Sequence, residues 1–373
     1  MPSSISSSER DADVQTSALR RMPRVNPAVL VGALFLFACG VAGMEAILSA
    51  RGIRATAADD ESAWLHQRAR ARVLGGKALL LIGASRMQTD VDLDVLRTST
   101  HLEPVQLALD GNSFLPILAG LARDPDVRGT VLVSFQDSAL LYDPDTSVAA
   151  AYDRQYAQRR GSGYTFDRSA AEDMLTAIVR DNMRSYADGA RPLTSLTTRV
   201  LAAEAKPQYS LLLPDRSRLL DYAKVDVPAV YYARAIRELG EDFSIPAGTE
   251  YSVADAQLRA RIDALPTQPD ALYLQRAAQV AADAATIEAR GGRVVFVVMP
   301  TAGLVTQIEQ KRFPREQFWD RFVTLTHSRT VHFEDLPALR DFPVPDGSHI
   351  DFRERKRFTE LLLDAIVRSA PKQ

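Results

Sequence analysis

The sequence contains a single cysteine, Cys39, among 373 residues. One cysteine cannot form an intramolecular disulfide, and it cannot supply a cysteine-rich metal site. The formal net charge at neutral pH is only −2, which gives neither a broad basic surface nor an acidic tail. We therefore expect a fold that is stabilised by a packed core, and no nucleic acid as a partner.

Histidine is also scarce, with five residues in the chain. Four of them, His66, His101, His327 and His332, show no metal-like spacing with carboxylates. We expect neither a metal nor another cofactor. The abundant residues are hydrophobic (46%) and charged (25%), a composition that is typical of one large globular domain or two smaller ones.

The N-terminal region has the strongest change in composition. Residues 1–26 are polar and rich in serine, and we expect a disordered cytoplasmic tail. Residues 27–48 carry no charge from Pro27 to Met44 and approach the roughly 20 residues that span a bilayer, so they predict a transmembrane helix. A cleaved signal peptide, a lipoprotein signal and a buried helix of a soluble domain are the alternatives. Three arginines before the segment against two after it favour a single-pass protein of the inner (cytoplasmic) membrane, with the C-terminal domain facing the periplasm or the outside.

The rest of the chain alternates between strand-like and helix-like patterns. After a helical or mixed stalk at residues 49–76, three apolar runs each end in a turn: KALLLIGAS, EPVQLALDGNS and RGTVLVSFQDS. Helix-like segments lie between them, and this repetition predicts a parallel α/β sheet. Residues 142–290 interrupt it and read as a large, mostly helical insertion. The pattern resumes with GGRVVFVVMPT and TVHFEDL and ends in an amphipathic helix at about residues 351–369.

The turns that follow the strands are the first candidates for function, because ligands of open α/β sheets bind beyond the carboxyl ends of the strands. Ser85 follows the first run, and a DGSH loop near the C-terminus carries Asp346 and His349. A serine becomes nucleophilic when a histidine that is oriented by a carboxylate takes its proton. The three residues therefore predict a catalytic triad, with Asp351 as an alternative carboxylate and helix capping as the alternative role of Ser85.

The IGAS turn, the Gly111-Asn112 turn after the second run and the DGSH loop together resemble the SGNH/GDSL hydrolase superfamily. With a membrane span in front, the chain looks like membrane-anchored bacterial members, including the alginate O-acetyltransferase-like, exopolysaccharide-associated branch. The resemblance covers about residues 77–135 and 291–373. It implies a flavodoxin-like three-layer parallel sheet for residues 77–373. It also implies Ser85 as the nucleophile, His349 and Asp346 as its partners, and Gly111 and Asn112 in the oxyanion hole.

Two departures from the family pattern leave a second function open. Ala84 stands where the family usually has aspartate, and no Gly-x-Asn motif follows the third strand in VSFQDSALL. Arg86, the next residue after Ser85, is expected either to contact an anionic group of the substrate or to form a structural ion pair.

The expected function is that of a serine esterase or O-acyltransferase that acts on ester groups of an envelope or extracellular polysaccharide, or on another acylated substrate. It would work alone or in an envelope biosynthesis complex. The alternative is a catalytically inactive SGNH-like subunit that binds polysaccharide or serves in assembly. A phosphatase ranks below both, because no Asp/His metal cluster is apparent.

Overall fold

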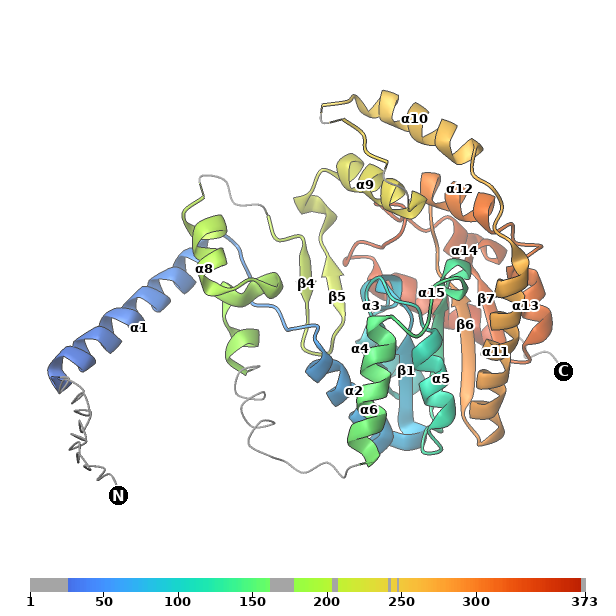
Figure 1. Ribbon diagram of the computed structural model, residues 1–373, viewed down its shortest axis with the longest axis horizontal. Coiled ribbons are helices and arrows are strands. Elements are labelled where there is room, and N and C mark those ends of the chain that lie inside the picture. The colour runs from blue at the N-terminus through green and yellow to red at the C-terminus, as the bar shows by residue number, and fades with distance from the viewer. Residues whose placement is uncertain (1–25, 162–177, 203–206, 241–242, 247, 370–373) are drawn as a thin grey trace, which may run out of the picture.

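The computed structural model describes residues 26–161, 178–202, 207–240, 243–246 and 248–369. The expected N-terminal tail lies outside the described residues except for Asn26. That residue caps the first helix, α1 (Pro27–Ala50), by accepting a hydrogen bond from the amide of Ala28. α1 is long and apolar enough to cross a membrane, and it projects away from the rest of the molecule (Figure 1).

Five parallel strands form the central sheet, in the spatial order β2-β1-β3-β6-β7. Every apolar run that was expected to be a strand is one, and the α/β class with a parallel sheet is confirmed. Because the three central strands, β1, β3 and β6, are buried on both faces, their sequences are almost continuously apolar. The bounds are β1 (Ala78–Ile82), β2 (Glu103–Gln106), β3 (Thr130–Phe135), β6 (Arg293–Val298) and β7 (Arg329–His332).

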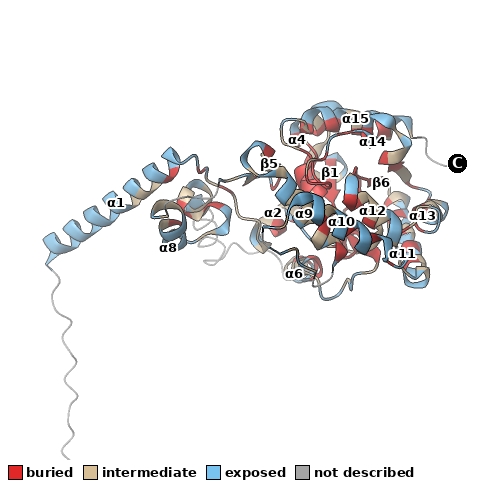
Figure 2. Cartoon of the chain, turned by 90° about the horizontal axis from the view of Figure 1, so that it is seen from above, coloured by how far each residue is buried: buried red, intermediate tan, exposed pale blue. Residues whose placement is uncertain are grey.

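Helices cover both faces of the sheet, as Figure 2 shows for α4, α14 and α15 on one side and α6 and α11 on the other. The first group packs together and against the edge strands β2 and β7. It consists of α4 (Leu93–Thr100), α14 (Pro337–Arg340) and α15 (Arg355–Arg368). The second group packs in sequence from α2 through α6, α5 and α11 to α13. Its bounds are α2 (Glu61–Leu74), α5 (Leu115–Arg123), α6 (Val148–Gly161), α11 (Asp270–Ala289) and α13 (Trp319–Leu325).

The segment that was expected to be a stalk is mostly part of the domain. α2 lies against β1 and β2, and its Trp64 is fully buried with the indole N–H donating to the carbonyl of Leu107. Burial of this large side chain anchors the helix to the core. Only residues 51–60 therefore connect α1 to the α/β domain.

The segment between α6 and α11 leaves the sheet. It contains helical residues 178–182 and the elements η3 (Arg184–Gly189), α8 (Pro192–Ser195), η4 (Leu196–Val200), β4 (Ser210–Leu212), β5 (Arg218–Leu220), η5 (Tyr222–Lys224), α9 (Val227–Leu239) and α10 (Tyr251–Asp263). α6 and α11 themselves pack on α5 and so belong to the α/β domain. The segment that leaves the sheet is therefore shorter than the insertion expected at residues 142–290. Residues 162–177 of the insertion that was expected to be mostly helical lie outside the described residues. The antiparallel β4–β5 hairpin was not expected, because strands of three residues show no readable alternation.

The close approach of β1 and β3 depends on Gly129, which precedes β3. A Cβ at this position would lie 2.3 Å from the carbonyl oxygen of Ala78, which is a backbone atom of β1. We expect Gly129→Ala to lower the melting temperature of the full-length chain in detergent, with a loss of about 1–3 kcal/mol in the free energy of unfolding. Gly76→Ala is the control, since the nearest atom to a Cβ there is 3.9 Å away. Equal melting temperatures for the two variants, followed by circular dichroism, would contradict this account.

Candidate active site

Ser85 is the first residue of α3 (Ser85–Thr89), two residues after Gly83 at the carboxyl end of β1. β1 has β2 on one side and β3 on the other, and such a reversal of strand order is where open α/β sheets bind ligands. Gly83 has φ 145°, and a Cβ there would lie 2.7 Å from the Cβ of Ser134 on β3. Glycine is therefore needed for the chain to pass β3 and to deliver Ser85 to this edge of the sheet.

The structure brings together the three residues that were expected to form a triad. His349 Nε2 lies 2.8 Å from Ser85 Oγ, and His349 Nδ1 lies 2.9 Å from Asp346 Oδ2. With Asp346 ionised, Nδ1 carries the proton and donates it to the carboxylate, which leaves Nε2 free to accept from the serine hydroxyl. The geometry is that of a nucleophile, a base and a group that orients the base.

The Asp346 carboxylate also shapes the loop that carries the histidine. Its Oδ1 accepts hydrogen bonds from the amides of Ser348 (2.9 Å) and His349 (2.7 Å). Burial alone would raise the pKa of Asp346. The hydrogen bond and charge of His349, the charge of Arg234 and the Ser348 amide outweigh burial and hold this pKa well below its usual range. Asp346 is thus ionised wherever the protein is folded near neutral pH.

Asp90 connects the serine helix to the histidine loop. It is fully buried, and its Oδ1 accepts hydrogen bonds from the amide of Ile350 (3.0 Å) and the hydroxyl of Thr89 (2.7 Å). Burial raises the pKa of Asp90 to about 6, against the opposing effects of His349, the hydrogen bonds and Arg86. The sequence analysis missed this residue, although it lies only five positions after Ser85. Its bond to Ile350 joins the end of α3 directly to the segment after His349.

Arg86 is bonded to Ser348 and Glu309. Its guanidinium is 2% exposed, lies 2.7 Å from Glu309 Oε1 and donates through Nε to Ser348 Oγ at 3.0 Å. Burial disfavours the charged form, but the carboxylates of Glu309, Glu238 and Asp90 together raise the pKa of Arg86 above its ordinary value. Of the two expected roles, the structure places Arg86 in a buried ion pair, where its charge already has a partner.

Gly111 and Asn112 follow β2 in the turn that was expected to supply oxyanion donors. Gly111 is exposed with φ 67°. The Asn112 side chain donates to the carbonyl of Asp110 (2.9 Å) and accepts from the amide of Ala149 (3.3 Å). Both ends of this amide are therefore bonded to backbone, and one N–H of the Asn112 side chain remains as a further donor. Their role in an oxyanion hole stays a prediction.

Arg234 on α9 is the second charged group at the histidine. Its Nη2 lies 3.3 Å from His349 Nδ1 and 3.5 Å from Asp346 Oδ2. One helical turn later, Glu238 is largely buried, and burial raises its pKa against the opposing charges of Arg86 and Arg234. The excursion from the sheet thus contributes a cation directly to the triad. No motif around Arg234 in the sequence marks this contact.

α9 is held over the histidine loop by Tyr231. The tyrosine hydroxyl accepts a hydrogen bond from the amide of Leu304 (2.7 Å), near the start of α12 (Gly303–Arg312). A Cβ on Gly303 would lie 2.1 Å from this hydroxyl, and a Cβ on Gly347 would lie 3.2 Å from the tyrosine ring. Both glycines have positive φ, so both backbone shape and space require them. The glycine of the DGSH loop serves to seat α9.

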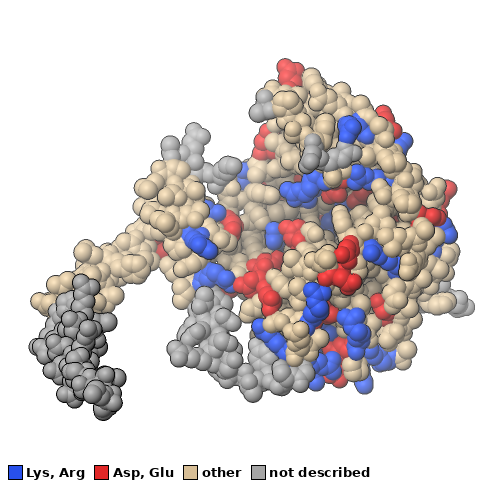
Figure 3. Space-filling model, viewed as in Figure 1, with Lys and Arg blue, Asp and Glu red and all other residues tan. Residues whose placement is uncertain are grey.

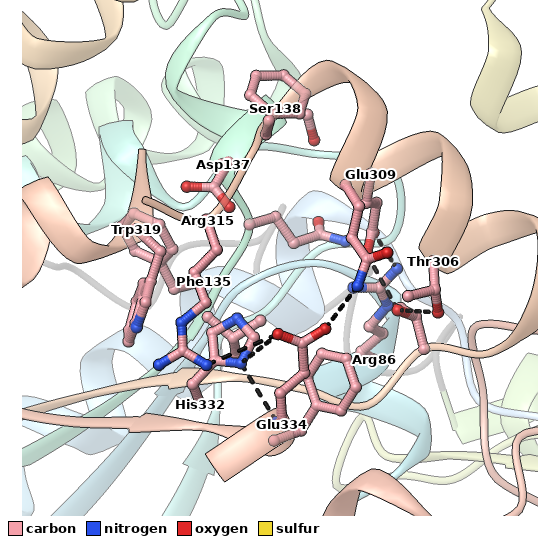
Figure 4. A pocket seen from close by; sticks show the side chains of 16 residues that line it. Arg86, Phe135, Asp137, Ser138, Thr306, Glu309, Arg315, Trp319, His332 and Glu334 are labelled. Carbon is pink, nitrogen blue, oxygen red and sulfur yellow. Dashed lines mark hydrogen bonds and ion pairs between the residues drawn. The ribbon is translucent and has the colours of Figure 1, made fainter. Parts of the chain in front are cut away.

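A small cavity of about 50 Å³ lies at the carboxyl ends of β3, β6 and β7, with Arg86 and Glu309 in its wall (Figure 4). The carboxyl of Asp137, just after β3, accepts a hydrogen bond from the Tyr273 hydroxyl (2.6 Å). Burial raises the pKa of Asp137 to about 7, and the nearby Glu309 adds to the rise. His332 on the opposite wall is largely buried, and burial together with the charge of Arg315 lowers its pKa to about 4. The cavity is large enough for a water molecule and too small for a sugar.

The arrangement can therefore perform nucleophilic chemistry at one serine. The three triad residues come from β1–α3 and from the loop before α15, which are more than 250 residues apart in sequence. Among the described residues, no cluster of three or more His, Cys, Asp or Glu side chains is close enough together to hold a metal ion.

No protein-family model matches the chain, and no curated protein matches it in sequence. The chemistry of the site therefore has to be inferred from its own atoms.

Asp137 makes stability depend on pH in a defined direction. Its pKa is about 7 in the folded chain and about 3.9 in an unfolded chain, so the folded state binds more protons between these values. Protonated Asp137 therefore adds at most about 4 kcal/mol to the free energy of unfolding. This contribution is fully present below about pH 4 and is lost as the pH rises to 7. We expect the melting temperature of wild type to fall relative to Asp137→Asn as the pH rises from 5 to 7.

The matched control for this experiment is Asp143→Asn. Asp143 is an exposed carboxylate whose pKa is lowered by hydrogen bonds from the amide of Asp145 and the hydroxyl of Thr146. This substitution should produce no decline of wild type relative to the variant over the same pH range. A constant difference between wild type and Asp137→Asn would show that Asp137 is ionised throughout.

Proposed function

We propose that this chain is a membrane-anchored serine esterase or O-acyltransferase with Ser85 as its nucleophile. The observation that carries the proposal is the 2.8 Å separation of Ser85 Oγ from His349 Nε2, with Asp346 bonded to the other ring nitrogen. Serine, histidine and aspartate in this geometry perform acyl transfer on several unrelated folds. A structural serine that merely caps a helix needs no such partner.

The reaction has two halves. Ser85 Oγ attacks an ester carbonyl while His349 Nε2 takes the hydroxyl proton, and His349 then returns this proton to the departing alcohol. The product of the first half is an acyl-serine. Water or another hydroxyl attacks it in the second half, with His349 again removing and returning one proton. Asp346 remains ionised and stabilises the imidazolium that forms in each half.

Donors for the developing oxyanion are available at the start of α3. The first amides of a helix have no partner within the helix, so those of Ser85 and Arg86 are free to bind the oxygen of the tetrahedral intermediate. Gly111 would add its backbone amide from the neighbouring turn. These donors would compensate for the absence of a Gly-x-Asn motif after β3.

The fold supports a place in the SGNH/GDSL superfamily. Counted within the main sheet, the strands follow the order 2-1-3-4-5 of flavodoxin-like sheets, with helices on both faces. The nucleophile follows the first strand, and the acid-base pair precedes the last helix, as in the family pattern that the sequence resembles. We assign the chain to a membrane-anchored bacterial branch that is associated with exopolysaccharide.

The location follows from α1. A span with its N-terminus in the cytoplasm would hold the α/β domain on the periplasmic or outer side of the cytoplasmic membrane. Acylated polysaccharides and other acylated envelope components are made or exported there, and an envelope biosynthesis complex would present them. The choice of substrate class rests on the family resemblance.

An inactive polysaccharide-binding or assembly subunit is the second candidate. The observation in its favour is the Asn112 side chain, whose amide donates to the Asp110 carbonyl and accepts from the Ala149 amide. Such a subunit would retain the triad as a relic. The two candidates differ in whether Ser85 reacts.

We expect a fluorophosphonate probe to label the purified full-length chain at Ser85, as identified by mass spectrometry. Ser85→Ala should abolish labelling and lower kcat/KM for an activated acetate ester by about 10³-fold or more. Ser138→Ala is the matched control, because Ser138 lines the cavity of Figure 4 and bonds to no triad residue. A chain that melts cooperatively but takes up no probe would reject the enzyme and favour the inactive subunit.

We expect Arg234→Gln to lower kcat/KM for an activated acetate ester by about tenfold. The Arg234 guanidinium lies 3.5 Å from Asp346 Oδ2 and 3.3 Å from His349 Nδ1, so its removal takes a charged contact away from the pair that orients the base. Arg237→Gln is the control, since Arg237 lies exposed on the same helix. A kcat/KM equal to that of wild type would contradict a role for Arg234 at the triad.

A further inference from the structure

Residues 178–202 form a helical unit at the C-terminal end of α1, which we name the collar. It consists of helical residues 178–182, η3, α8 and η4. Leu48 and Ile53 are buried against Ala187, and Met44 and Val200 pack around them. The collar therefore touches α1 only along its last two turns and the residues just after it (Figure 1).

The length of α1 places this contact at the membrane boundary. The uncharged residues 27–44 extend about 27 Å as a helix, which is close to the roughly 30 Å of the hydrocarbon core. Glu45 is the first charge after them, and Arg51 is the next. The part of α1 that the collar contacts thus begins where the hydrocarbon ends.

The two charged residues of the chain at this boundary are paired with backbone groups of the collar. The Glu45 carboxylate accepts hydrogen bonds from the amides of Arg184 (2.8 Å) and Ser185 (2.9 Å), at the start of η3. The Arg51 guanidinium donates to the carbonyls of Arg199 and Ala202, at and just after the end of η4. Such pairing is compatible with a surrounding of low water content.

The collar nevertheless leaves large apolar side chains uncovered. Leu193 is 72% exposed and Leu201 is 70% exposed, and Ile178 and Val179 are each about half exposed. The exposure of the two leucines matches that of the most exposed residues of α1, such as Leu36 at 71%. Figure 3 shows that the charged side chains of this face gather on the α/β domain, while α1 and much of the collar are uncharged.

We propose that the collar lies in the interfacial layer of the same membrane that α1 spans, with Leu193 and Leu201 inserted among the lipids. Its apolar surface continues the surface of α1 at the level where the helix leaves the hydrocarbon. Interfacial helices bury their apolar side chains about 5–10 Å into the boundary between headgroups and acyl chains. The lipid bilayer is thus the partner of this surface, and the proposal is independent of the chemistry at Ser85.

A second contact with the membrane fixes the orientation of the whole domain. The amide of Asp188 in the collar donates to Thr56 Oγ1 in the connecting segment, and Asp59 of that segment pairs with Arg216 at the hairpin turn. The hairpin reaches the residues after His349, where the amide of Phe352 donates to the carbonyl of Leu220. These bonds hold the site at one height and angle above the bilayer, which a single flexible tether could not do.

The test uses the full-length chain with Cys39→Ser, reconstituted into lipid nanodiscs. A cysteine introduced at Leu193 or Leu201 carries an environment-sensitive fluorophore, and quenching by brominated lipid is compared with quenching by aqueous acrylamide. The control is a cysteine at Val367, which is 75% exposed on the last turn of α15, near the C-terminus at the far end of the molecule (Figure 2). Thermal melts of each labelled chain verify that it is folded.

We expect brominated lipid to quench the labels at 193 and 201 about threefold more strongly than the label at 367, and acrylamide to show the reverse order. Acrylamide quenching at 193 and 201 equal to that at 367 would overturn the proposal, because the collar would then lie in water. Protection from both quenchers would also overturn it, since a second copy or a partner protein would then cover the leucines.

Discussion

The Asp346 carboxylate is the group on which the site depends. One oxygen accepts hydrogen bonds from two backbone amides and so fixes the turn of the DGSH loop. The other oxygen accepts the hydrogen bond from His349 Nδ1. A buried carboxylate is costly unless every lone pair has a donor, so the loop and the imidazole orientation form together or not at all. The same carboxylate orients the ring so that Nε2 is directed at Ser85. Loop shape, tautomer and nucleophile geometry are consequences of one buried negative charge.

The parallel sheet brings this charge to the serine. β1 and β7 both end at the same edge, so the turn after the first strand and the loop before the last helix meet although 264 positions separate Ser85 from His349. Asp90 then joins the two segments directly through the amide of Ile350. Around them, Arg86, Glu238, Glu309 and Arg234 alternate in sign, which allows several charges to be buried side by side.

Much of this arrangement could be predicted from the sequence. Five apolar runs that end in turns indicated the parallel sheet, and Ser85, Asp346 and His349 lay in turns that such a sheet must bring to one edge. Arg234 and the β4–β5 hairpin could not be predicted, because their positions depend on tertiary packing of a segment without strong periodicity. The place of α2 could not be predicted for the same reason. Its sequence is rich in alanine and arginine and indicated a stalk, whereas the buried indole of Trp64 bonds it to Leu107, just after β2. Asn112 was placed in the right turn, but its side-chain partners are set by the start of α6.

Glu45 has a consequence for the order of assembly in the proposed membrane-anchored arrangement. Its carboxylate sits near the end of the apolar helix α1, and its two amide donors follow 139 and 140 residues later in the chain. If α1 is inserted as the chain is made from its N-terminus, those donors do not yet exist, and the carboxylate is first solvated at the membrane surface. Pairing with the amides of Arg184 and Ser185 then follows when the collar folds. In that arrangement, insertion of α1 and folding of the α/β domain are separate events in time, joined by the late pairing of one side chain.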